Sequence, residues 1–202
     1  CFVGFDAYQK LLDTDVDVVI LATAPHYRPQ HLKAAVDASK HIFCEKPVAV
    51  DPVGVRSVLE TSELATQKGL NLVSGLCWRY DLGVRETVKR IKEGAIGDLV
   101  AIHENYLTGT LWHRTPEEDW SEMENQNRNW LYYAWLSGDH IVEQFIHSLD
   151  KAMWLMDDQP PVSCVGLGGR QVRTEPKFGE IYDHHALCYE WENGVKTFAF
   201  TR

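Results

Sequence analysis

The sequence contains no long apolar run, because nothing in its 202 residues approaches the roughly 20 consecutive apolar residues that a membrane-spanning helix needs. It also lacks a positive net charge, since 20 Lys and Arg residues stand against 29 Asp and Glu residues, for a net charge of −9. A nucleic-acid-binding face would require an excess of basic residues. We therefore expect neither a membrane nor a nucleic acid among the partners of this protein.

The cysteine pattern indicates no disulfide pairing. The chain has five cysteines, an odd number, with no C-x-x-C motif among them. Four of them lie in apolar, strand-like settings, where free cysteine behaves as a small hydrophobe. We expect reduced core residues, which favours a cytoplasmic location with export as the alternative. The five positions are Cys1, Cys44, Cys77, Cys164 and Cys188.

Strand and helix patterns alternate over the first part of the chain. Asp15–Ala22 is an apolar run rich in β-branched residues, as expected for a strand covered on both faces. A helix pattern then leads to a second strand at His41–Cys44. A longer helix pattern, from the N-cap Asp51 to Gly69, precedes a third strand at Leu70–Ser74. This alternation predicts a parallel, doubly wound sheet.

The tripeptide Glu45-Lys46-Pro47 follows the second of these strands directly. In open α/β sheets, ligands bind beyond the carboxyl ends of the strands. Proline ends the strand abruptly because it fixes φ and removes a donor, which leaves Lys46 at the edge of the sheet. The tripeptide therefore indicates a ligand site, although a lysine before a turn is more often simply solvated.

The later part of the chain has a different texture. Asn193-Gly194, the strongest short hairpin signal, separates strand patterns at Ala186–Trp191 and Val195–Thr201. We therefore expect residues 1–80 to belong to a partial Rossmann-type parallel sheet. Residues 81–202 are expected to begin an α+β domain with a mainly antiparallel sheet.

An aromatic-rich insertion, Thr108–Leu136, lies within residues 81–202. Its rings suit packing on their own domain, which is the more common role of such a surface excursion. The alternative is a wall that stacks on the apolar face of a sugar, with Trp135 as a candidate for substrate binding.

A second chemical constellation spans Gly138–Asp150, where the spacing predicts one helix. Glu143 and His147 are four residues apart and would share a face, with His140 one turn earlier. Such a pair occurs commonly as surface stabilisation. A metal-dependent hydrolase that uses these side chains is an alternative, but the recognised H-E-x-x-H order is missing, and we expect no metal.

Several separated motifs together resemble the Gfo/Idh/MocA family of NAD(P)-dependent oxidoreductases, in family order and with family-like spacing. They are Val18–Thr23, His31, Lys40–Pro47, Gly94–Gly97 and Gly138–Asp150. The resemblance implies the second half of a nucleotide-binding domain followed by a substrate domain. It further implies hydride transfer between NAD or NADP and a sugar, polyol or related hydroxyl compound, in a homo-oligomer.

The resemblance also implies roles for individual residues. His147 corresponds to the family's acid/base, and Glu143 stands where the family has Asp. Lys46 would stabilise charge on the reacting oxygen, and Glu45 would hold the nicotinamide ribose. Further cofactor contacts are implied for Thr23, Pro25, His31, Lys46 and Pro47. Arg79 and Tyr80, just past a strand's carboxyl end, would touch substrate, with capping of the core as the alternative for both.

The glycine-rich G-x-G-x-x-G turn that the family places after its first strand is missing from these residues. We therefore interpret the sequence as an internal piece of a longer protein. Three alternatives to a dehydrogenase stay open at this point: a non-catalytic sugar- or cofactor-binding member, an NAD-assisted glycosidase, and the metal-dependent hydrolase.

Overall fold

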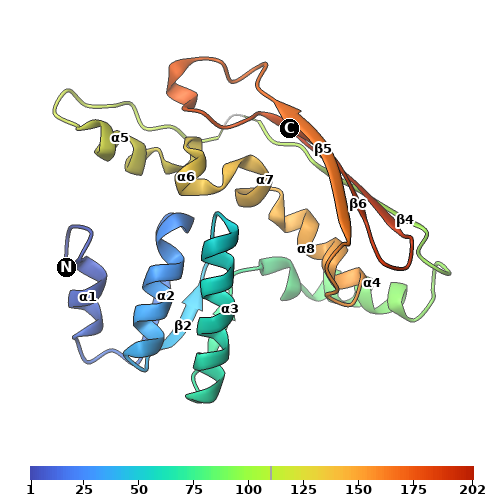
Figure 1. The fold of residues 1–202 in the computed structure, drawn as a ribbon, viewed down its shortest axis with the longest axis horizontal. Helices are drawn as coiled ribbons and strands as arrows, with labels where there is room; N and C mark the ends of the chain where they lie inside the picture. Colours follow the sequence, from blue (N-terminus) through green and yellow to red (C-terminus); the bar gives the residue numbers. More distant parts are fainter. Residues whose placement is uncertain (110) are drawn as a thin grey trace. The chain divides into compact units, whose positions relative to one another are not determined.

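The computed structural model describes residues 1–109 and 111–202 (Figure 1). Over these residues the chain divides into two compact units. The first unit comprises residues 1–75 with the short segment 134–138, and the second comprises residues 76–133 and 139–202. The predicted fold class is confirmed, with a parallel sheet in the first unit and a mainly antiparallel sheet in the second.

The first unit is built on a parallel sheet in the order β1-β2-β3, formed by Val18–Leu21, His41–Cys44 and Leu72–Ser74. Helices α2 (Arg28–Asp37) and α3 (Pro52–Gln67) connect consecutive strands. Parallel neighbours need such crossover connections, because a tight turn can join only antiparallel strands. All the carboxyl ends of the strands therefore lie at one edge of the sheet.

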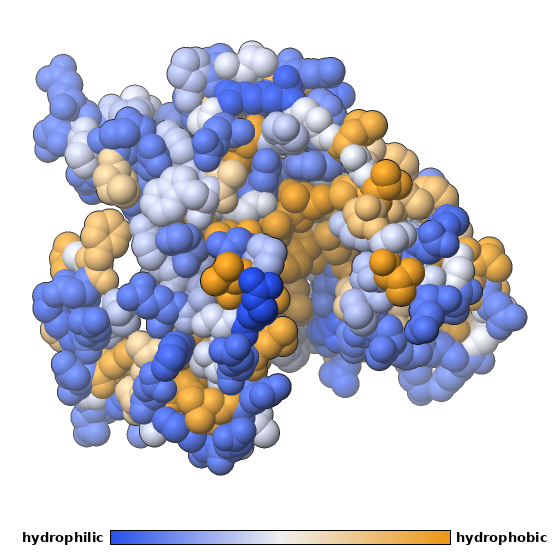
Figure 2. Space-filling model, viewed as in Figure 1, coloured by the Kyte–Doolittle hydropathy of each residue, from blue (hydrophilic) through white to orange (hydrophobic). Residues whose placement is uncertain are grey.

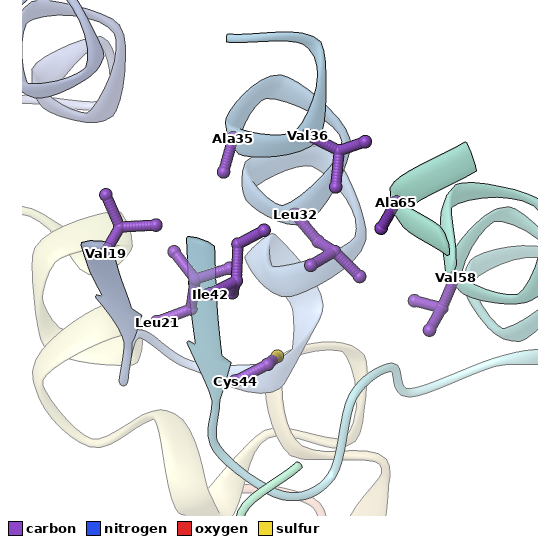
Figure 3. Close-up of a cluster of buried hydrophobic side chains, with 9 residues drawn as sticks. All are labelled: Val19, Leu21, Leu32, Ala35, Val36, Ile42, Cys44, Val58 and Ala65. Carbon is purple, nitrogen blue, oxygen red and sulfur yellow. The ribbon is translucent and has the colours of Figure 1, made fainter. Parts of the chain in front are cut away.

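One face of this sheet packs on α2 and α3 and forms the core of the unit (Figure 3). The strands contribute Val19, Leu21, Ile42 and Cys44, and the helices contribute Leu32, Ala35, Val36, Val58 and Ala65. The expectation that the first strand is covered on both faces was wrong for the described residues. Val18 and Ile20 are 58% and 71% exposed, because both helices lie on the opposite face.

The helix boundaries follow the capping signals of the sequence. Asp51 accepts a hydrogen bond from Gly54 N at 2.7 Å and begins α3, and Gly69, with φ of 67°, lies just beyond its end. Asp81 accepts from Val84 N at 2.8 Å and begins α4 (Leu82–Lys92). These side-chain acceptors satisfy backbone donors that have no partner within the first helical turn.

The second unit contains a sheet in the order β4-β7-β6-β5, with the strands Ala101–Tyr106, Lys196–Thr201, His184–Glu190 and Ser163–Gly169. Strands β5, β6 and β7 pair antiparallel, and the predicted hairpin connects β6 to β7 with Gly194 at φ of 85°. Strand β4 pairs parallel with β7, which the sequence pattern did not indicate.

The long helix predicted over Gly138–Asp150 is interrupted. Helix α7 (Asp139–Glu143) ends before α8 (Ile146–Leu155) begins. The carbonyl of His140 accepts from both Gln144 N at 3.0 Å and Phe145 N at 3.1 Å, and the second bond closes a wider turn than an α-helix has. Phe145 is fully buried, so packing of its ring accompanies the break.

Shorter elements complete the described units, with η denoting a 3₁₀ helix. They are α1 (Ala7–Leu12), η1 (Pro25–Tyr27), η2 (Cys77–Arg79), α5 (Glu122–Arg128), η3 (Trp130–Tyr132), α6 (Ala134–Ser137) and η4 (Pro176–Phe178). No helix among the described residues is long and apolar enough to cross a membrane. On the face shown in Figure 2, hydrophobic residues gather in separate patches between hydrophilic ones.

The cysteines are free, but the expectation that they lie in the core was correct for Cys44 alone within the described residues. Cys1, Cys77 and Cys164 are exposed, and Cys188 is half-buried. Cys164 lies on β5, at the edge of its sheet. An apolar, strand-like setting therefore does not by itself predict burial when the strand is an edge strand.

Glu104 on β4 gives a test of the packing in the second unit. Its side chain is buried, and burial raises its pKa from 4.5 to about 7, while the Lys151 ammonium acts in the opposite direction. Between these two pH values the folded protein keeps a proton that the unfolded chain releases. We therefore expect the free energy of unfolding to fall by roughly 2 kcal/mol as pH rises from about 4.5 to 7.

The Glu104→Gln variant should remove this part of the pH dependence, because the amide does not titrate. Urea unfolding of both proteins between pH 4.5 and 8 measures the difference. Glu192→Gln is the matched control, since Glu192 is exposed in the β6–β7 hairpin. An unchanged pH slope in Glu104→Gln would show that the carboxyl group is solvated.

Candidate functional site

The carboxyl-terminal edge of the first unit's sheet carries the polar groups that the sequence singled out. Strand β1 leads into Thr23, strand β2 into Glu45-Lys46-Pro47, and strand β3 into Gly75. Because parallel strands end at the same edge, these segments are neighbours there. The backbone confirms this for two of them, since Gly75 N donates to the carbonyl of Cys44 at 2.8 Å.

A buried arginine holds the Glu45-Lys46-Pro47 turn. Arg28 is 3% exposed, and its Nη1 donates to the carbonyl oxygen of Glu45 at 3.0 Å and to that of Pro47 at 2.6 Å. The Lys46–Pro47 peptide bond between these carbonyls is cis. One guanidinium nitrogen therefore clamps the backbone on both sides of Lys46 and fixes where its side chain starts.

Sequence reasoning missed Arg28, although a signal was present. Arg28 is four residues before Leu32, on the helical stripe that continues through Val36 into the core. A charged residue in such a stripe is rarely buried without partners. Its partners here are main-chain carbonyls, which leave no trace in a sequence.

The Glu45 carboxylate is also fixed in place. Its Oε2 accepts from the backbone N of Lys46 at 3.1 Å. On its other side lies Gly75, where an added Cβ would come within 2.6 Å of the same oxygen. Any side chain at position 75 would therefore displace the carboxylate, so the glycine provides the space that Glu45 occupies.

The predicted cofactor residues after β1 also come together. Thr23 Oγ1 lies 3.3 Å from His31 Nδ1, and Pro25 is buried at the start of η1. The His31 ring lies between Tyr8, with centroids 4.4 Å apart, and Tyr27, stacked at 6.0 Å. Burial lowers the pKa of His31, which favours its neutral form.

Trp135 belongs to the first unit and packs there, apart from the other rings of the aromatic insertion. It contacts His26 edge-to-face with centroids 5.0 Å apart, and His26 in turn contacts Tyr27 at 5.1 Å. In the second unit, by contrast, Trp112 packs against Trp130 at 6.0 Å. That part of the insertion thus follows the packing interpretation, and Thr110 within it lies outside the described residues.

In the second unit, His140 is 1% exposed, and its hydrogen bond is made to the sheet. Its Nε2 lies 2.6 Å from Thr201 Oγ1, and this hydroxyl donates to the carbonyl of Tyr106 at 2.9 Å. Because the hydroxyl has one proton, His140 Nε2 must be the donor. Burial lowers the pKa of His140 to about 4, with smaller effects from Arg173 and His185, so the ring is neutral.

These contacts involve a residue that the metal-dependent hydrolase would use. His140 uses its Nε2 on Thr201 and therefore does not present that nitrogen as a ligand. Over residues 1–109 and 111–202, no group of three or more His, Cys, Asp or Glu side chains is arranged to hold a metal ion.

Tyr106, which sequence reasoning missed, joins the two predicted catalytic residues of this unit. Its ring stacks on that of His147 with centroids 6.3 Å apart and planes at 24°. Its hydroxyl donates to Gln144 Oε1 at 3.1 Å, and Gln144 Nε2 donates to Glu143 Oε2 at 2.5 Å. Glu143 is buried and His147 half-buried. The alternation of side chains along β4 could have indicated it, because Ile102, Glu104 and Tyr106 point to the same, inner face of the strand.

Arg79 forms ion pairs with two carboxylates of the second unit. Its Nε donates to both carboxylate oxygens of Asp150, at 2.9 and 3.0 Å, and its Nη2 lies 2.5 Å from Asp158 Oδ1. These carboxylates raise the pKa of the guanidinium, which also lies over the Trp154 ring. Tyr80, by contrast, is 57% exposed just after η2.

Two family models match this chain and together cover most of it. The model described as an oxidoreductase family with an NAD-binding Rossmann fold matches residues 3–75. The model of the Gfo/Idh/MocA C-terminal domain matches residues 84–200.

Individual proteins agree with this match. Inositol 2-dehydrogenase 3 of Saccharopolyspora erythraea is 30% identical over 90% of this chain and 46% of its own length. The 2,7-anhydro-N-acetylneuraminate hydratase of Escherichia coli is 27% identical over 89% of this chain and 44% of its own length. The chain thus spans about half the length of these relatives. The crystal structure of myo-inositol 2-dehydrogenase from Lactobacillus plantarum shares the fold, with a TM-score of 0.76 at 19% identity, covering 98% of this chain and 54% of that one.

The clamp by Arg28 predicts a large loss of stability when its guanidinium is removed. Arg28→Ala deprives two main-chain carbonyls of a charged donor in a buried setting, so we expect the free energy of unfolding to fall by roughly 2–4 kcal/mol. Chemical denaturation measures the loss. Arg56→Ala, on the exposed side of α3, is the matched control and should change stability little. Equal effects of the two substitutions would mean that the clamp contributes nothing to folding.

Proposed function

Because the chain belongs to the Gfo/Idh/MocA family, we propose that it is the central part of a nicotinamide-dependent dehydrogenase. The enzyme would move a hydride between the cofactor and a hydroxyl-bearing carbon of a sugar or polyol. The observation that carries this proposal is the clamped Glu45-Lys46-Pro47 turn at the carboxyl edge of a parallel sheet, within the segment that matches an NAD-binding model. Relatives named as inositol dehydrogenases support the substrate class.

The residues at this edge fit a nicotinamide nucleotide, NAD or NADP. Glu45 offers a carboxylate pressed against Gly75, a suitable acceptor for ribose hydroxyls. Thr23 and His31 form a polar pair after β1, and Pro25 and Pro47 shape the backbone on either side. When bound, the cofactor supplies the hydride-accepting ring, and every other task falls to side chains.

The proton has to leave the substrate hydroxyl as the carbon–hydrogen bond breaks. We assign this proton to His147, because an imidazole titrates near ~6.5 and exchanges protons at working pH. Lys46 would donate to the same oxygen and stabilise its developing negative charge. Glu143, whose carboxylate accepts a hydrogen bond from Gln144 Nε2, would help to orient His147. Tyr80 and Trp135 would contact the sugar with their rings.

The enzyme is further proposed to be a homo-oligomer. The face of the second unit's sheet that points away from α8 exposes apolar side chains. Val165 and Leu167 on β5 are 72% and 70% exposed, and Phe200 on β7 is 39% exposed. A second copy of the protein would cover such a face.

A redox-neutral reaction is the second candidate, in the form of NAD-assisted glycoside cleavage. The relative named as a hydratase favours it, since that name describes no net oxidation. Incubating the full-length protein with NAD or NADP and a panel of sugars, polyols and glycosides separates the two. Accumulation of reduced nicotinamide, measured by its absorbance, supports the dehydrogenase. Cleavage of a glycoside without accumulation of reduced nicotinamide supports the second candidate.

Lys46→Ala should lower kcat by roughly a hundredfold or more, because it removes a positive charge from the reacting oxygen. The measurement is steady-state turnover of the full-length enzyme, with circular dichroism to verify the fold. Lys33→Ala, at an exposed position of α2, is the control and should leave kcat unchanged. A Lys46→Ala enzyme with normal kcat would remove Lys46 from the mechanism.

A further inference from the structure

Several hydrogen bonds hold the backbone of Tyr106 in the sheet of the second unit. It is the last residue of β4, paired with Thr201 in the parallel ladder. Its carbonyl accepts from Arg202 N at 3.1 Å and from Thr201 Oγ1 at 2.9 Å, and Thr201 also contacts His140. The backbone that carries the Tyr106 ring is therefore held by strand β7 and, through Thr201, by helix α7.

The break between α7 and α8 makes this ring important. A continuous helix would align Glu143 and His147 by its own spacing. Here Glu143 is the last residue of α7, and His147 lies in the first turn of α8. Helical spacing therefore does not fix the pair, and the contacts that cross the break must do so.

Tyr106 makes contacts on both sides of the break. Its ring stacks on His147, in α8, with centroids 6.3 Å apart. Its hydroxyl bonds Gln144 Oε1 at 3.1 Å, in the turn between the helices. Gln144 Nε2 then reaches Glu143 Oε2 at 2.5 Å. One side chain of the sheet thus touches the imidazole directly and the carboxylate through one amide.

The direction of this chain of hydrogen bonds follows from its members. A carboxylate only accepts, so Gln144 must turn its NH₂ group towards Glu143 and its carbonyl oxygen towards Tyr106. The tyrosine hydroxyl is then the donor. Burial raises the pKa of Tyr106, and the charges of Glu143 and Cys77 raise it further, so the hydroxyl keeps its proton.

We propose that Tyr106, acting through Gln144, is the positioning residue that holds the Glu143 carboxylate in place beside the His147 ring. The inference rests on the proposed function for its catalytic meaning. The titratable groups that face Tyr106 are Glu143 and His140 from α7, His147 from α8, and Cys77 from η2.

The test uses Tyr106→Phe, which keeps the stacked ring and removes the donor. In the full-length enzyme, kcat should fall roughly tenfold at unchanged KM, because misplacement of a catalytic group slows the chemical step. Gln144→Leu should do the same, and the double variant should cost no more than the larger single change.

Tyr189→Phe is the matched control, because Tyr189 is an inward-facing tyrosine of β6, outside this chain of bonds. It should leave kcat and KM as in the parent enzyme. A Tyr106→Phe enzyme that behaves like this control, or additive losses in the double variant, would overturn the positioning role.

Nuclear magnetic resonance keeps this result separate from the proposed function. Nuclear Overhauser contacts between the Glu143 side chain and the His147 ring should be present in the parent protein and in Tyr189→Phe and should be lost in Tyr106→Phe, whether or not the protein turns over a sugar. Unchanged contacts in Tyr106→Phe would overturn the inference. Absence of turnover in the parent protein would instead overturn the proposed function, while loss of these contacts in Tyr106→Phe would still support the positioning of Glu143.

Discussion

The arrangement of the first unit's edge depends on one buried guanidinium. Arg28 leaves the core-facing stripe of α2 and bonds the carbonyls on both sides of Lys46. Burying a charge is costly unless it is hydrogen-bonded, so the burial of Arg28 and the shape of the turn are parts of the same interaction. The shape of the Glu45-Lys46-Pro47 turn then places the Glu45 carboxylate against Gly75. The packing of Arg28 thereby sets the geometry of the edge that we propose as the cofactor site.

In the second unit, a different set of hydrogen bonds holds an irregular segment in place. Its helices break between Glu143 and Ile146, which separates residues that a longer helix would align. The side chain of Tyr106 and the bond between Thr201 and His140 tie these short helices to the sheet. In both units, therefore, polar side chains from regular elements hold the irregular segments that carry the proposed chemistry.

The sequence predicted what depends on local pattern. It correctly predicted the alternation of strands and helices, the Asp51 cap and the Asn193-Gly194 hairpin. The matching family models confirm the family resemblance. What it did not show depends on contacts between distant segments. Arg28 bonds carbonyls 17 and 19 residues away, and Tyr106 bonds Gln144, 38 residues away. The site residues themselves remain proposals that rest on this geometry and on the resemblance.

A crystal structure of the full-length protein grown with NAD or NADP tests the central claim most directly, because it shows whether the clamped edge binds the cofactor. The account predicts nicotinamide-ribose hydroxyls within hydrogen-bond distance of the Glu45 carboxylate, with both Arg28 bonds to the turn retained. A cofactor bound with its nicotinamide end away from the Glu45-Lys46-Pro47 turn, or a turn that rearranges and releases Arg28, would contradict it.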